Sequence, residues 1–304
     1  MSVSAMAGTP VPGLAHALKL SPVTPDTGIA ALPWFSFEVL ASAGCRPAAG
    51  RIARRVERAY WLLRQALDVA PPVRLLVLDR ADWRQFAARD DFGVVHLNDA
   101  GDLVVGSEPA QAWSDLSAWL RDAVDGASLQ VLLRLYGRDP DSGGPALGSL
   151  AEALVAHELA HRFAAYAGAR FPRRWLDEAF ANYAMVAVLG EADPVGLRRL
   201  GALAQAVETL DVELPSLVRF ERAFGMLELV PSVVAQLALT RGVYQTYAVA
   251  GIAPLARMLR LFRAGIATDK LPDHEIARLL GFHAHPTLAA IPSLFPAARL
   301  RAAA

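Results

Sequence analysis

The stretch that constrains this chain most is the pentapeptide His157-Glu158-Leu159-Ala160-His161. It lies within the run Gly148 to Ala167, which contains no proline and has apolar residues at helical spacing, so we expect a helix there. Residues four positions apart lie on one face of a helix, so His157 and His161 can direct their imidazoles at a common point. Glu158 lies one step round the helix, beside that point. This pattern, H-E-x-x-H, is typical of two zinc ligands with a neighbouring general base.

A catalytic zinc site usually has three protein ligands and one open position, so a third ligand is required. The segment Phe171 to Tyr183 offers one, because a proline and early acidic residues predict that a second helix starts there. Gly190 marks the expected end of this helix. Between His161 and Glu178 the first helix can finish, a short loop at Gly168 to Pro172 can turn the chain, and the second helix can return antiparallel. The carboxylate of Glu178 would then complete a metal site.

H-E-L-A-H followed by W-L-D-E-A-F-A-N-Y, at residues 157–161 and 175–183, resembles the gluzincin zinc metallopeptidases. The closest group is the broad peptidase MA-like one, a distant relative of the M1 aminopeptidases. The resemblance implies one Zn²⁺ per chain, held by His157, His161 and Glu178. It also implies that Glu158 is the general base, taking a proton from the attacking water and passing it to the departing amine.

The chain departs from the M1 pattern in three respects. Ala179 replaces the usual glycine, the interval between His161 and Glu178 is somewhat shorter, and no G-x-M-E-N stretch is present. That last stretch grips a free amino terminus in the M1 enzymes. The resemblance is strong over residues 148–190, and it indicates a distant relative rather than an ordinary aminopeptidase.

The expected fold class is α+β, in the zincin-like or gluzincin arrangement. We expect three parts: an irregular N-terminal arm at 1–32, an α/β lobe at 33–168 that holds a small mixed sheet and ends in the H-E-x-x-H helix, and an all-helical lobe at 169–304 that carries the third ligand. Proline- and glycine-rich composition marks the arm, and after Gly190 only helical patterns follow.

Alternating and continuous apolar patterns predict the elements of the α/β lobe. They are strands at Trp34–Leu40 and Val73–Leu78, helices at Arg51–Val69, Ala81–Arg89, Gln111–Val124 and Ser128–Tyr136, and a hairpin of Gly93–Leu97 with Asp102–Gly106. In gluzincins the sheet edge beside the metal helix pairs with an extended peptide substrate. Asp102–Gly106 is our candidate for that edge, and an ordinary internal hairpin is the alternative.

The helical lobe is punctuated by residues that begin or end helices. Asp193 can cap a helix that starts at Pro194 and runs to about Leu210. A long helix is expected at Ser232–Phe262, with a bend near Gly242 or at Gly251–Pro254, and a last helix at Asp273–Leu280 that ends at Gly281.

Gluzincins such as the M1 group place a tyrosine where negative charge develops on the substrate carbonyl, and a donor aimed at that oxygen helps catalysis. The segment 243–248 resembles the one that carries this tyrosine, with Tyr247 at the glycine position of the pattern. We therefore expect Tyr244, rather than Tyr247, to be the donor. The alternative is that both rings are packing residues with a polar tip.

Other polar residues near the motif have two interpretations each. Asn182 lies one turn after Glu178 and is a candidate to orient one of the histidines, as is Asp177, which also suits a helix amino terminus. His96 is expected to be an ordinary residue next to a turn rather than part of the cleft. His283 and His285 precede a proline and are expected on the surface.

Composition excludes several classes of function. Thirty basic and thirty acidic residues cancel, which gives no indication of nucleic acid or of an anionic membrane as partner. A single cysteine, Cys45, excludes an internal disulfide and a cysteine zinc site. No secretory signal is recognised in residues 1–18, and the long apolar regions contain arginines, so no membrane span is expected. A cytoplasmic enzyme is the expectation, with a processed precursor as the alternative.

The sequence thus predicts a zinc-dependent metallopeptidase that acts on a peptide or protein. Two alternatives remain open: a non-catalytic gluzincin-fold binding or scaffold protein, and a zinc hydrolase of a non-peptide amide or ester. The motif specifies the attacking water and not the acyl group, so the sequence does not choose the substrate. Nor does it indicate the oligomeric state.

Overall fold

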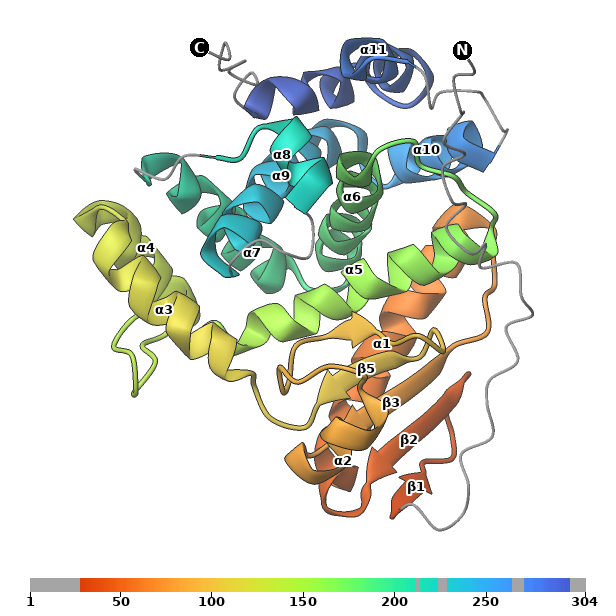
Figure 1. Cartoon of the computed structure of the whole chain (residues 1–304), viewed down its shortest axis with the longest axis vertical. Coiled ribbons are helices and arrows are strands. Elements are labelled where there is room, and N and C mark those ends of the chain that lie inside the picture. The colour runs from red at the N-terminus through yellow and green to blue at the C-terminus, as the bar shows by residue number, and fades with distance from the viewer. Residues whose placement is uncertain (1–27, 211–213, 224–228, 264–270, 296–304) are drawn as a thin grey trace, which may run out of the picture.

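The computed structural model describes residues 28–210, 214–223, 229–263 and 271–295, and over these the chain has a mixed α+β fold (Figure 1). It is mostly helical, with a small five-stranded mixed sheet. This confirms the expected α+β class. Residues 1–27 of the expected arm lie outside the described residues. The end of that arm, Ile29–Ala31, forms strand β1.

The sheet has the strand order β1-β2-β3-β5-β4. Its other members are β2 (Glu38–Ser42), β3 (Arg74–Leu78), β5 (Leu103–Gly106) and β4 (His96–Leu97). Strands β2, β3 and β5 are parallel, and β1 and β4 pair antiparallel with them at the two edges. The predicted hairpin is confirmed, but the prediction that Asp102–Gly106 is the edge was wrong. Strand β5 lies between β3 and β4, so β4 is the edge on that side.

Both faces of the sheet are covered, because residues of the central strands alternate between two apolar clusters. Leu75 and Val77 of β3 belong to the large core shared with α1 (Arg46–Leu67), whereas Leu76 and Leu78 pack with Trp83 of α2 (Arg80–Phe86). The continuous apolar run that predicted β3 is explained by this burial on both sides.

The predicted strand Trp34–Leu40 begins and ends earlier in the chain than the observed strand β2. Trp34 has a left-handed backbone (φ 86°) and its side chain is 93% exposed. Strand β2 begins at Glu38, and its last four residues are all buried. Aromatic content favoured the earlier position, but Phe35 and Phe37 stack on each other next to the strand instead.

The helices divide into those around the sheet and those beyond it (Figure 1). Helix α5 (Gly148–Tyr166) packs against α1 on one side and α6 (Arg174–Ala192) on the other. The remaining α-helices are α3 (Gln111–Ala123), α4 (Gly126–Tyr136), α7 (Pro194–Ala206), α8 (Leu217–Ala223), α9 (Leu229–Ala250), α10 (Ala253–Arg263) and α11 (Asp273–His283). Helix α5 therefore links the sheet to the helical part of the chain.

Helix ends differ from prediction at two glycines. Helix α6 continues through Gly190 to Ala192, and α11 continues through Gly281 to His283. The phenol of Tyr247 lies where a side chain on Gly190 would be, so packing rather than termination accounts for that glycine. The expected break at Gly251 is confirmed: this residue has φ +60° and separates α9 from α10.

Two buried arginines tie together the sheet and the helix packed on it. Arg74, at the start of β3, forms an ion pair with Asp102 just before β5, and both side chains are at most 5% exposed. Arg162 of α5 donates a hydrogen bond (3.0 Å) to the carbonyl of Pro72, directly before β3. The Arg162 contact holds α5 against the sheet, and the Arg74–Asp102 pair joins β3 to the start of β5. Within the described ranges, no helix is long and apolar enough to cross a membrane.

Candidate metal centre

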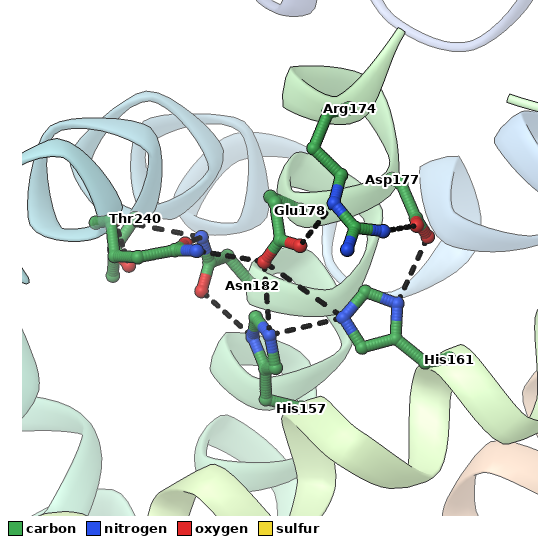
Figure 2. A network of polar contacts seen from close by, with 8 residues as sticks. His157, His161, Arg174, Asp177, Glu178, Asn182 and Thr240 are labelled. Carbon is green, nitrogen blue, oxygen red and sulfur yellow. Dashed lines mark hydrogen bonds and ion pairs between the residues drawn. The ribbon is translucent and has the colours of Figure 1, made fainter. Parts of the chain in front are cut away.

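Helices α5 and α6 bring together the three residues that the sequence analysis selected as metal ligands. Helix α5 ends at Tyr166, Gly168 adopts a left-handed backbone (φ +73°), and the chain returns to begin α6 at Arg174. His157 and His161 lie one turn apart on α5, and Glu178 lies in the early turns of α6 facing them (Figure 2).

The ligand atoms form a compact triangle. Nε2 of His157 lies 3.2 Å from Nε2 of His161 and 3.3 Å from Oε2 of Glu178, and the third side is 3.9 Å. The side chains of His157 and Glu178 are 7% and 3% exposed, and that of His161 is 19% exposed. Three potential ligand atoms are therefore gathered at one largely dehydrated point.

This triangle fits a tetrahedral zinc ion. Zinc binds imidazole nitrogen and carboxylate oxygen at about 2.0–2.2 Å, which places neighbouring tetrahedral ligands roughly 3.3–3.5 Å apart. Two sides of the observed triangle agree with this spacing, and the third exceeds it by a few tenths of an ångström. Two histidines and one carboxylate are also a donor set used by catalytic zinc sites.

The other ring nitrogen of each histidine has its own acceptor, as Figure 2 shows. Nδ1 of His157 lies 3.0 Å from Oδ1 of Asn182, and Nδ1 of His161 lies 2.9 Å from Oδ1 of Asp177. When Nδ1 donates these hydrogen bonds, Nε2 carries the lone pair that a metal needs. The sequence analysis named both orienting residues, and the structure assigns each to a different histidine.

Gln236 on α9 is a member of this network that the sequence analysis missed. Its Nε2 donates to Oε2 of Glu178 (2.7 Å), and its Oε1 accepts from Nδ2 of Asn182 (2.7 Å). Thr240, one turn later, donates to the backbone carbonyl of Gln236. No local signal marks Gln236, which lies far along the chain in an apolar helix.

Arg174 places a positive charge at the first turn of α6. Its guanidinium donates to Oδ2 of Asp177 (3.1 Å) and its Nε lies 3.6 Å from Oε1 of Glu178 (Figure 2). It therefore neutralises part of the carboxylate charge that surrounds the histidines. Because its side chain is 45% exposed, it contacts solvent as well.

The buried charges are strongly coupled. Burial alone would lower the pKa of His161. Three nearby carboxylates outweigh this effect and raise the pKa to about 10: Asp177, which contributes most, Glu178 and Glu158. Burial would raise the pKa of Glu178, but the hydrogen bond from His157 and the charge of His161 lower it to about 2. Without a metal, a proton on His161 thus compensates Glu178, in the position where a cation would bind.

Glu158 follows His157 on α5 and is half-buried, and its charge helps to raise the pKa of His161. Among the residues that the structure describes, none forms a hydrogen bond or ion pair with Glu158. Its carboxylate is therefore not engaged by another described side chain, as a general base requires.

The structure does not bring Tyr244 or Tyr247 to the ligands. The ring of Tyr244 contacts Gly201 on α7, and the hydroxyl of Tyr247 donates to Glu191 at the far end of α6. At 1.5 Å rise per residue, Tyr244 lies about 12 Å along α9 from Gln236, which contacts the centre. This arrangement matches the packing alternative for both rings.

Other histidines have structural contacts. His96 is 6% exposed, and its ring nitrogens lie 2.8 Å and 2.6 Å from the carbonyl oxygens of Val94 and Ala87. His285 accepts from the backbone of Thr287 at the start of a 3₁₀ helix, Pro286–Leu294. Within the described ranges, His157, His161 and Glu178 form the one group suited to hold a metal ion.

Comparison with known proteins gives no family assignment: no protein-family model, curated protein or solved structure matches the chain.

Proposed function

We propose that this protein is a zinc-dependent metallopeptidase of the gluzincin type, in which one Zn²⁺ per chain is bound by His157, His161 and Glu178. The observation that carries the proposal is the triangle of Nε2, Nε2 and Oε2 atoms, with sides of 3.2, 3.3 and 3.9 Å. The α+β fold, with the H-E-x-x-H helix between a small sheet and a helical part, supports the zincin-like arrangement.

A zinc ion with an open position lowers the pKa of water to about 7 and polarises a carbonyl group. The residues of this chain then have distinct tasks. Asn182 and Asp177 hold the imidazoles so that both Nε2 atoms face the same point. Glu158 accepts a proton from the attacking water and delivers it to the departing amine.

A peptide or protein is the proposed substrate, and β4 is the proposed place for its backbone. Strand β4 is the edge of the sheet, it pairs antiparallel with β5, and it packs beside α5. An edge strand has unpaired backbone groups on one side, which an extended peptide can pair with. A non-peptide amide or ester is the alternative substrate class, because the proposed base and metal ligands would act on any acyl group.

A non-catalytic scaffold is the alternative from another class. It would need the fold but not a free carboxylate beside the metal. Glu158 forms no hydrogen bond or ion pair within the described part of the chain, so structural stability does not account for it. This favours the catalytic proposal.

Metal content and hydrolysis, measured on the same preparations, test the proposal. We expect about one zinc per chain by mass spectrometry, lost in His157→Ala, and cleavage of a peptide library by the zinc-loaded protein. Glu158→Gln should keep the zinc and lose hydrolysis, whereas Glu108→Gln, at an exposed glutamate, should change neither. Absence of zinc from folded protein after zinc addition would refute the metal site. Full activity of Glu158→Gln would refute the mechanism.

A further inference from the structure

A cavity lies between helices α1, α4, α5, α6 and α7, and its lining includes neither the candidate metal ligands nor Glu158. Its volume is about 330 Å³, which is at the lower end of the range for small-molecule sites. This cavity is built on the same pair of helices, α5 and α6, that carry the metal centre, but from their opposite ends: the start of α5 and the end of α6.

The arginines that line this cavity outnumber the acids, and two of them have guanidinium nitrogens without a hydrogen-bond acceptor in the described part of the chain. Two acids line it, and both have partners: Glu152 forms an ion pair with Arg55, and Asp193 caps α7 by accepting from Gly196. Arg58 forms no hydrogen bond or ion pair with any described residue. Arg199 uses only its Nε, which donates to the carbonyl of Leu135. Two guanidinium groups therefore keep donors for a further acceptor.

Tyr136 supplies a neutral donor at the same place. Its side chain is 8% exposed and lines the cavity, and its hydroxyl has no hydrogen-bond partner in the described ranges. The guanidinium of Arg199 lies over its ring at 5.8 Å, and burial raises the pKa of this phenol, so that it stays protonated. This hydroxyl is therefore an accessible donor at the cavity, free to donate to a ligand or to water.

The amino-terminal end of α5 adds to the positive potential. The first turn of this 19-residue helix has no side-chain cap, and Ser149 and Leu150 in that turn line the cavity. The N–H of Leu150 donates to the carbonyl of Leu147, and the dipole of the helix still favours an anion at this end. Small and apolar residues form the rest of the wall, among them Ala153, Ala156, Val188 and Leu200.

We infer that this cavity binds a small organic anion, with its anionic head, such as a carboxylate, at Arg58, Arg199 and Tyr136, and a short apolar body against the alanine and aliphatic wall. The two free guanidinium groups and the unpartnered hydroxyl select the charge of the head. The apolar wall and the limited volume select a body of a few carbon atoms over an extended polar chain. This inference does not depend on the proposed hydrolase activity.

Isothermal titration calorimetry of the full chain with three probes tests the inference. Octanoate carries head and body, octan-1-ol carries the body alone, and acetate carries the head alone. We expect octanoate to bind at least about tenfold more tightly than either of the others, which corresponds to about 1.4 kcal/mol. Loss of binding at high salt would accompany an electrostatic head contact.

Variants locate the site. Arg58→Met and Tyr136→Phe should each weaken octanoate binding by about fivefold or more, as expected for loss of a charged or buried hydrogen bond. Arg54→Met is the matched control, because Arg54 is exposed on the same helix and does not line the cavity. Arg58 is exposed and forms no hydrogen bond or ion pair with a described residue, so Arg58→Met tests the site if Tyr136→Phe is unstable.

Equal binding of octanol and octanoate would overturn the assignment of an anionic head. No binding of octanoate at about 10 mM, or unchanged binding in both variants, would overturn the site itself. A zinc-free His157→Ala preparation should bind octanoate as the parent does, so failure of the metal proposal and failure of this one are distinguishable.

Discussion

The side-chain amide of Gln236 donates a 2.7 Å hydrogen bond to Oε2 of Glu178, the same oxygen that lies 3.3 Å from Nε2 of His157. The other end of that amide accepts from Asn182, which in turn contacts Nδ1 of His157. Helix α9 is therefore connected to a candidate ligand and to the residue that orients another one. The candidate metal centre therefore involves a third helix, α9, besides α5 and α6, which carry the candidate ligands.

We therefore expect Gln236→Leu to weaken zinc binding by about 10–100-fold, the usual effect of removing a group that orients a ligand. Leucine keeps most of the volume and removes both hydrogen bonds. Competition with a chelator of known affinity measures the change. Gln245→Leu, at an exposed position of the same helix, is the control and should leave affinity unchanged. Affinity within about twofold of the parent would show that Gln236 does not orient Glu178.

Asp177→Asn should separate the charge of this residue from its shape. In the parent protein, Nδ1 of His161 lies 2.9 Å from Oδ1 of Asp177. Asparagine still offers an oxygen at this place, but the negative charge is lost. Zinc affinity should fall by about tenfold or more, and the pKa of His161 should fall as well, because the charge of Asp177 is the main cause that raises it.

Chelator competition and a histidine titration by NMR in metal-free protein measure the two effects of Asp177→Asn. Asp99→Asn, an exposed aspartate in the hairpin turn, serves as the control. A lower zinc affinity with an unchanged His161 titration would mean that geometry, and not charge, is what Asp177 supplies.

Zinc binding should release a proton, because His161 is charged in the metal-free protein at neutral pH. Its pKa is raised to about 10, so the metal must displace this proton. Calorimetry in buffers of different ionisation enthalpy should give about one proton per zinc at pH 7, and affinity should rise about tenfold per pH unit between roughly pH 6 and 8. A binding enthalpy independent of the buffer would contradict a protonated His161.

His161 and Glu178 both make the stability of the metal-free protein depend on pH. The raised pKa of His161 gives stability that is complete below its ordinary value of 6.5 and lost as pH rises through about 10. The lowered pKa of Glu178 gives stability that is complete above 4.5 and lost as pH falls through about 2. Urea unfolding in EDTA should therefore show the largest contribution of this pair between pH 4.5 and 6.5. His161→Gln should remove the alkaline loss.

The proximity of His157, His161 and Glu178 could be predicted because it depends on local sequence alone. The pair His157 and His161 needs only the helical period, and Glu178 needs only a short loop and an antiparallel return. The orienting residues Asn182 and Asp177 lie on the same second helix. The contacts among these five residues are all made within one helical hairpin.

Gln236 and the sheet edge could not be predicted, because they depend on which distant elements become neighbours. Gln236 lies in an apolar helix, where a polar residue has no local periodicity to explain it. Strand β4 is the edge because β5 pairs with β3, and strand order follows from the whole sheet and not from the hairpin. Tyr244 and Tyr247 show the same limit, since a resemblance over a few residues did not fix where that part of α9 lies.

Gly190→Ala tests the packing of Tyr247 directly, and the sign of its effect is diagnostic. In an open helix interior, glycine to alanine stabilises by up to about 1 kcal/mol. Here the phenol of Tyr247 occupies the place of the new methyl group, so we expect the free energy of unfolding to fall by about 1–3 kcal/mol. Urea unfolding of the single variants and of Gly190→Ala with Tyr247→Ala gives the coupling. Removing the ring should cancel the loss, and a stabilising Gly190→Ala in the parent would mean that Tyr247 lies elsewhere.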